Sequence, residues 1–124
     1  MARVIGIGGL FFRARDPGRL SSWYAEHLDV LPPPASYDAP AWTQAAGPTV
    51  FAPFEDEGAH EHLGPAGWGL NLRVDDLDGM VERLRAAGID VVVDADTYPN
   101  GRFASLHDPE GNPIQLWQVA ERIT

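Results

Sequence analysis

The chain has 124 residues, enough for one domain with its own hydrophobic core, and its apolar fraction of 44% argues against disorder. It contains no cysteine and no lysine, which excludes disulfides, thiolate nucleophiles and Schiff-base chemistry on a side-chain amine. Its formal net charge of −9 opposes binding to nucleic acid or to an anionic membrane; it either favours a neutral or cationic partner or serves solubility alone.

The first half of the chain predicts a strand, a helix and two shorter strands. Residues 3–14 are typical of a strand that ends at Asp16-Pro17, where the aspartate is placed to cap a helix and the proline to begin it. That helix should extend to about His27. Extended pieces are expected at 40–45 and 49–54, although Pro53 limits the last of these to a sheet edge or a bulge. Residues 55–67 are polar and rich in Gly and Pro, as in a connecting loop.

The second half predicts the same order of elements. A strand is expected at 69–74, a helix capped by Asp75 or Asp76 and stopped at Gly88, and an extended piece at 90–94. The chain should end in a hairpin with strands at 102–107 and 113–118. Alternation places Phe103, Ser105 and His107 on one face of that hairpin with Gln115 and Trp117, a face that meets either water or a ligand.

The two halves are related by an internal repeat. A shift of 60 positions aligns seven pairs of residues: Gly9 with Gly69, Leu10 with Leu70, Phe12 with Leu72, Arg13 with Arg73, Asp16 with Asp76, Leu20 with Met80 and Tyr24 with Leu84. The predicted fold class is therefore α+β, with two βαβββ units, at about 3–56 and 66–119, in a single domain covering 1–124.

The paired units, the strand-Asp-Pro-helix opening and the ending DPEGNPIQLWQ resemble the vicinal oxygen chelate superfamily of glyoxalases, bleomycin-resistance proteins and extradiol dioxygenases. The resemblance covers about residues 4–118. It implies a mixed sheet curved into a cup with the helices outside, and in many relatives a homodimer.

The resemblance also implies where a metal would bind in the family. The positions of its two His ligands and its Glu ligand map onto Gly9, Gly69 and Gln115. Glycine has no side chain and a neutral amide is a weak ligand for a divalent ion, so we expect no metal and no other cofactor here. The His60-Glu61-His62 cluster is the other place where ligands concentrate, and it is interpreted as a solvated acidic loop.

The residues expected to line the cup are mostly aromatic or amide-bearing. They are Trp42, Gln44, Asn71, Tyr98, Arg102, Phe103, Ser105, Gln115 and Trp117. Such a wall suits a planar or amphipathic small molecule. No catalytic residue is identified, since His107 has no evident partner to make it a general base.

Three functions remain open from the sequence. The first is metal-independent binding of a small molecule, by which a drug or metabolite is sequestered. The second is a glyoxalase- or lyase-like enzyme with a remodelled site, and the third is an interaction module whose cup is filled with side chains. No apolar run approaches the roughly 20 residues of a membrane span and no signal-peptide pattern is present, so a cytoplasmic location is expected.

Overall fold

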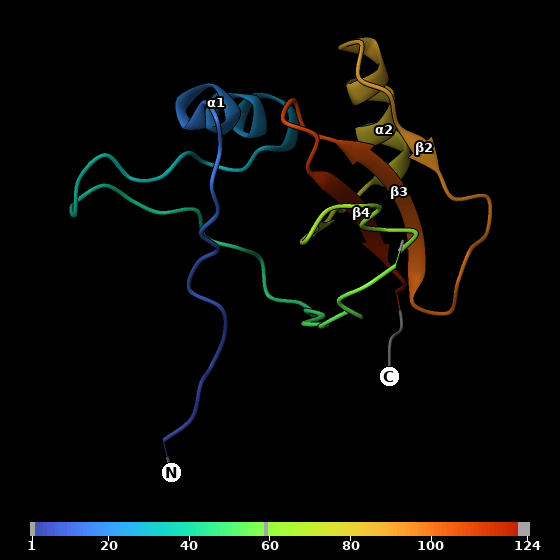
Figure 1. The fold of residues 1–124 in the computed structure, drawn as a ribbon, viewed down its shortest axis with the longest axis horizontal. Coiled ribbons are helices and arrows are strands. Elements are labelled where there is room, and N and C mark those ends of the chain that lie inside the picture. Colours follow the sequence, from blue (N-terminus) through green and yellow to red (C-terminus); the bar gives the residue numbers. More distant parts are fainter. Residues whose placement is uncertain (1, 59, 122–124) are drawn as a thin grey trace.

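A computed structural model describes residues 2–58 and 60–121. Its elements in chain order are α1 (Pro17–Leu28), β1 (Leu70–Arg73), α2 (Leu77–Ala86), β2 (Val92–Val93), β3 (Gly101–His107) and β4 (Pro113–Val119). The strands form one mixed sheet in the order β1-β4-β3-β2, with β1 parallel to β4 and the other pairs antiparallel. Figure 1 shows α2 against this sheet, and α1 beside the turn between β3 and β4.

Helix α1 begins and ends where its terminal residues dictate. The side chain of Asp16 accepts a hydrogen bond from the Arg19 N–H at 3.1 Å, and Pro17 occupies the first turn, as predicted. At the other end Asp29 adopts a left-handed φ of 59°, and its N–H bonds the Tyr24 carbonyl. Leu20, Tyr24 and Leu28 are buried, at the spacing of a helix that packs one apolar face against the core.

Helix α2 covers one face of the sheet. Asp76 caps it by accepting from the Gly79 N–H at 3.0 Å, and Leu77, Val81 and Leu84 are buried beneath it. The sheet residues in the same core are aliphatic: Leu70, Leu72, Ala104, Leu106, Ile114 and Leu116. Within the described residues neither helix has the length and apolar character needed to cross a bilayer.

The β3–β4 hairpin, predicted from its turn residues, is the best-paired part of the sheet. Its turn is organised by Asp108, whose carboxylate accepts from the N–H groups of Glu110 and Asn112 and from the Asn112 amide at 2.8 to 3.0 Å. The Tyr24 hydroxyl of α1 donates to the same carboxylate at 2.7 Å. Glu110 in turn accepts from the N–H groups of Arg15 and Asp16. The turn therefore fixes α1 to the sheet.

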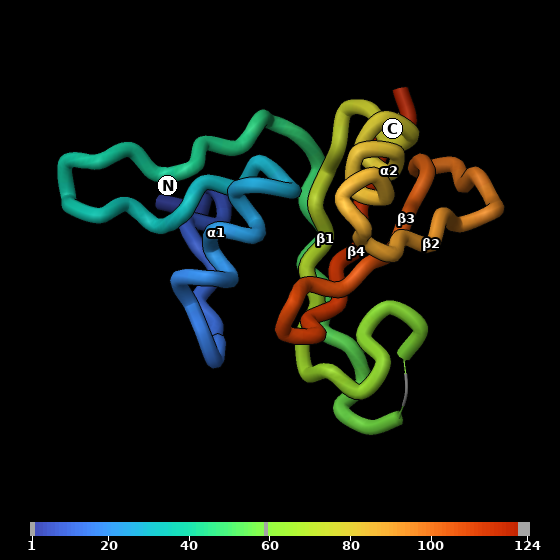
Figure 2. Tube along the Cα trace, turned by 90° about the horizontal axis from the view of Figure 1, so that it is seen from above, coloured from blue at the N-terminus to red at the C-terminus, as the bar shows by residue number. Residues whose placement is uncertain are grey.

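The first half of the chain corrects the sequence-based fold. Among the described residues, 3–14, 40–45 and 49–54 belong to no strand, so one βαβββ-like unit is present rather than two units curved into a cup. Figure 2 shows the chain between α1 and β1 running outside the sheet for most of its length. A strand needs neighbours for its backbone groups, and the predicted neighbours here are interrupted by Pro40, Pro48 and Pro53, which cannot donate. Residues 3–14 consequently have no strand to pair with.

Candidate functional site

The sheet has a second face, opposite α2, which we call the open face. Its side chains are those that alternate with the core residues: Asn71, Arg73, Phe103, Ser105, His107, Pro113, Gln115 and Trp117. The strand register arranges them in cross-strand rows. Asn71 lies beside Gln115, which lies beside Ser105, and the next row is Arg73, Trp117 and Phe103. The predicted grouping of the hairpin side chains by face is confirmed.

A chain of hydrogen bonds leads from the open face into the preceding loop. The Asn71 amide donates from Nδ2 to Oε1 of Gln115 at 2.8 Å, and Gln115 Nε2 lies 3.3 Å from Nδ1 of His62. The other ring nitrogen, Nε2 of His62, lies 3.4 Å from a carboxylate oxygen of Glu61. Four polar side chains thus form one connected row, which we call the amide–histidine row.

The loop that supplies His62 is a compact turn spanning residues 60–66. The Gly64 N–H donates to the His60 carbonyl at 2.7 Å, and the Ala66 N–H donates to Leu63 at 3.0 Å. The His62 N–H donates to Nδ1 of His60 at 3.2 Å. The His60 ring stacks on Phe54, with centroids 4.1 Å apart. These contacts hold the turn in a definite shape against the sheet.

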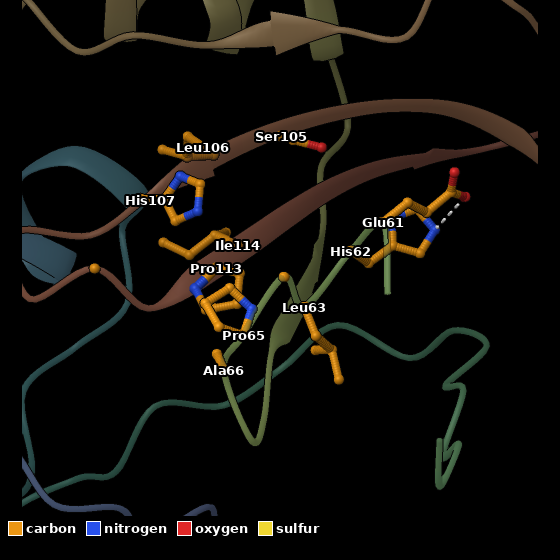
Figure 3. Close-up of a pocket in the computed structure, with 12 residues that line it drawn as sticks. Glu61, His62, Leu63, Pro65, Ala66, Ser105, Leu106, His107, Pro113 and Ile114 are labelled. Atoms are coloured by element: carbon orange, nitrogen blue, oxygen red, sulfur yellow. Dashed lines mark ion pairs between the residues drawn. The ribbon is translucent and has the colours of Figure 1, made fainter. Parts of the chain in front are cut away.

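A cavity of about 440 Å³ lies between this turn and the end of the hairpin. Figure 3 shows Leu63, Pro65 and Ala66 from the turn on one side and Ser105 and His107 of β3 on the other. Glu61 and His62 lie at its edge, with their ion pair drawn as a dashed line. The volume falls within the range that small-molecule sites occupy, and the lining combines apolar groups with a few polar ones.

An aromatic group borders the open face beyond this cavity. The rings of Phe103 and Trp117 are nearly parallel, with centroids 6.0 Å apart, and Tyr98 meets Phe103 edge-on at 5.8 Å. Trp117 is only 5% exposed and donates from Nε1 to the Asn100 carbonyl, so it supports the group from beneath. Tyr98 is 40% exposed. The hydrogen bond that its hydroxyl donates to Asp94 raises the pKa of Tyr98 above its usual value.

One of the residues predicted to line the cup lies on the opposite face of the sheet. Arg102 is on the α2 side of β3, where its guanidinium pairs with Asp78 at 3.0 Å and lowers the pKa of that exposed carboxyl. Trp42 and Gln44 belong to the unpaired segment 40–45. The last residue of this segment contacts the sheet, since the Ala45 carbonyl accepts a hydrogen bond from the Arg73 guanidinium at 2.9 Å. The structure brings together Asn71, Ser105 and Gln115, and separately Tyr98, Phe103 and Trp117.

Sequence reasoning missed the role of residues 60–66. The His60-Glu61-His62 cluster is interpreted from sequence as a solvated acidic loop; Glu61 and His62 are indeed exposed, but His62 also lies against Gln115. The internal repeat contained a partial signal, because the shift of 60 positions sets Glu55 opposite Gln115. The residue that reaches Gln115 lies seven positions further along the same polar segment.

The residues at the implied metal positions do not fit a divalent ion. Gly9 lies in the unpaired segment 3–14. A Cβ atom added to Gly69 would lie 2.7 Å from Cδ2 of Leu63, so the leucine side chain occupies the space that a ligand side chain at this position would need. Within residues 2–58 and 60–121, no three His, Asp or Glu side chains are grouped as potential metal ligands. The groups around Gln115 are the Asn71 amide and the His62 imidazole, and the Glu61 carboxylate contacts the far side of that imidazole.

Comparison with known proteins identifies relatives of this fold. A family model described as "Glyoxalase-like domain" matches residues 9–117. TnmS3, an antibiotic binding protein from Streptomyces sp. CB03234, is 42% identical over 42% of this chain and 42% of its own, with a TM-score of 0.39. A glyoxalase/bleomycin resistance protein from the same strain is 38% identical over 44% of this chain and 49% of its own, with a TM-score of 0.37. Each of these two matches therefore spans less than half of either protein.

A more complete match shows the fold alone. TioX from Micromonospora sp. ML1 is 20% identical over 86% of this chain and 93% of its own, with a TM-score of 0.51. No curated protein matches the chain. The family model covers most of the sequence, including α1, the amide–histidine row and the hairpin turn. The chain belongs to the glyoxalase-like domain family of the vicinal oxygen chelate superfamily.

Proposed function

We propose that this protein binds a small molecule on its open face without a metal ion, and that it acts by sequestering a drug or metabolite. The observation that carries the proposal is the cavity of about 440 Å³ next to the amide–histidine row. A cavity of this size with apolar walls and a few oriented polar groups is typical of ligand sites. Ser105 and His62 line this cavity, and we propose that Gln115 and Asn71, which follow His62 in the row, extend the polar contact surface for the ligand.

The charge of the protein favours a neutral or cationic ligand. The formal net charge is −9, and the side chain of Glu61 stands at the edge of the cavity. An acidic field increases the encounter rate of a cation and repels an anion, with a strong dependence on ionic strength. The aromatic group of Tyr98 and Phe103 offers a surface for a flat ring.

Two small molecules of similar shape and opposite charge test this proposal. Tryptamine and indole-3-acetate share a ring and differ in the sign of their charge, so both can be titrated into ¹⁵N-labelled protein in the presence of a chelator. We expect amide shifts at residues 61–64, Ala66, Asn71, Ser105 and Gln115. Tryptamine should bind about threefold more tightly at low salt, because an exposed ion pair contributes at most about 1 kcal/mol. Shifts confined to other surfaces, or turnover of the ligand, would overturn the proposal.

We also propose that the protein works as a homodimer. Support comes from the first half of the chain, where Val4, Ile5 and Phe11 are 91%, 91% and 96% exposed. Monomeric proteins rarely expose so many large apolar side chains on neighbouring segments. Light scattering after size exclusion should give twice the mass of 13.5 kDa. A monomer at micromolar concentration would contradict this part of the proposal.

A further inference from the structure

We propose that His62 sets the direction of the amide–histidine row, and that protonation of His62 reverses the row and the hydrogen-bonding character of the open face. The inference rests on the proposed function, because Glu61 and His62 line the cavity of the proposed ligand site and connect it to Gln115 and Asn71. It makes His62 a positioning residue that determines which ligand groups the site accepts.

The direction of the row follows from what each atom can donate. Nδ2 of Asn71 donates to Oε1 of Gln115 at 2.8 Å, so the amide nitrogen of Gln115 is the group that faces His62. An amide nitrogen is a donor only, and therefore Nδ1 of His62, 3.3 Å away, must accept and carry no proton. In a neutral imidazole the proton is then on Nε2, which lies 3.4 Å from the acceptor Oε1 of Glu61. The row runs one way, from Asn71 to Glu61.

Protonation of His62 removes the acceptor at its centre. Both ring nitrogens of an imidazolium are donors, so Nδ1–H would face the amide N–H group of Gln115. Rotating the Gln115 amide by about 180° presents its oxygen to His62 and its nitrogen to Asn71. Asn71 must then turn its own oxygen inward and its NH₂ group outward. The face that offered a carbonyl oxygen to a ligand now offers a donor.

The surroundings of His62 permit this change. Its side chain is 40% exposed, so a proton can arrive from solvent. The titratable groups beside it are the carboxylate of Glu61 and the imidazole of His60, whose ring centroid is 5.4 Å away. On the sheet side its neighbours Asn71, Gln115 and Ser105 are neutral, and His107 lines the far wall of the same cavity. Asp94 and Asp96 lie further out, around Tyr98. The negative charges of these two residues and of Glu61 all contribute to the raised pKa of Tyr98.

The test needs no ligand, so its failure is distinct from failure of the proposed function. Two-bond ¹H–¹⁵N correlation of the imidazole signals assigns the tautomer of each histidine. Above the titration of His62 we expect its Nε2–H form, and the side-chain amide signals of Asn71 and Gln115 should shift with the same midpoint as His62. The reverse tautomer at high pH, or amide signals that ignore the titration, would overturn the inference.

Two variants separate the row from its neighbourhood. His62→Asn keeps an acceptor close to the position of Nδ1 but cannot be protonated, so the amide signals of Asn71 and Gln115 should lose their pH dependence. His60→Asn changes the neighbouring imidazole in the same turn and should leave the coupled shift in place. Loss of the coupled shift in both variants, or in neither, would contradict the assignment to His62.

Discussion

The Gln115 amide nitrogen lies 3.3 Å from Nδ1 of His62, although 53 positions separate the two residues in the chain. Position 115 is the one at which the family resemblance implies a metal-binding glutamate. Here an amide joins β4, one of the two inner strands of the sheet, to the turn that lines the cavity. The position at which the family resemblance implies a metal ligand thus holds a neutral amide that connects Asn71 to His62.

Replacing Gln115 with Leu should weaken tryptamine binding about tenfold. The change removes the hydrogen bonds to Asn71 and His62 while preserving most of the side-chain volume, and each bond of this kind is worth about 1 kcal/mol. Isothermal titration measures the effect. Arg102→Ala is the matched control, because Arg102 lies on the α2 side and pairs with Asp78. Equal losses in both variants would place the ligand elsewhere.

Replacing Tyr24 with Phe should lower the free energy of unfolding by about 2 kcal/mol at neutral pH. The hydroxyl is buried and donates to the carboxylate of Asp108 at 2.7 Å, and bonds to charged partners contribute roughly 1.5–3 kcal/mol. Urea denaturation followed by fluorescence measures the loss. Tyr37→Phe removes a hydroxyl from a fully exposed ring and is the control, with no measurable change expected.

The same hydroxyl should make stability fall at alkaline pH. Burial raises the pKa of Tyr24, with further contributions from the hydrogen bond and negative charge of Asp108. Above a pH of about 10 an unfolded tyrosine loses its proton while the folded one keeps it, so the unfolded state binds fewer protons and stability decreases as pH rises. The stability difference between wild type and Tyr24→Phe should shrink over this range. A difference that stays constant to a pH of about 11 would show that the Tyr24 pKa is not raised.

Replacing Gly101 with Ala should destabilise the hairpin by about 3 kcal/mol. Gly101 has a φ of 138°, and an added Cβ would collide with the Gln118 carbonyl and lie 2.9 Å from Nε1 of Trp117. Thermal unfolding is the readout. Gly18→Ala is the control, since a Cβ there meets nothing within 4 Å and the helix gains a better former. A small loss for Gly101→Ala would indicate that the start of β3 can rearrange.

The parts of the fold that could be predicted from sequence are those with local physical signals. Asp16-Pro17 and Asp76 begin helices because their side chains satisfy free N–H groups, and Gly88 ends one with a φ of 81°. The turn around Asp108 fixes the hairpin through its own side-chain bonds. Alternation then assigned Ser105 and Gln115 to the same face, and the register places them side by side.

The parts that could not be predicted depend on distant partners. Strands at 3–14, 40–45 and 49–54 required neighbours that the described structure does not provide, and pattern alone carries no information about a missing neighbour. Likewise His62 is one of several polar residues in a loop, and nothing local shows that it reaches Gln115. The roles of Trp42 and Gln44 in binding stay predictions.

The most direct test of the central claim is the metal dependence of ligand binding. Tryptamine affinity should be measured by isothermal titration with excess chelator and again after adding Zn²⁺, Ni²⁺ or Fe²⁺ to metal-free protein. We predict the same dissociation constant in every case, because the amide–histidine row and the cavity need no ion. Binding that appears only with one of these metals, and is lost again on chelation, would contradict it.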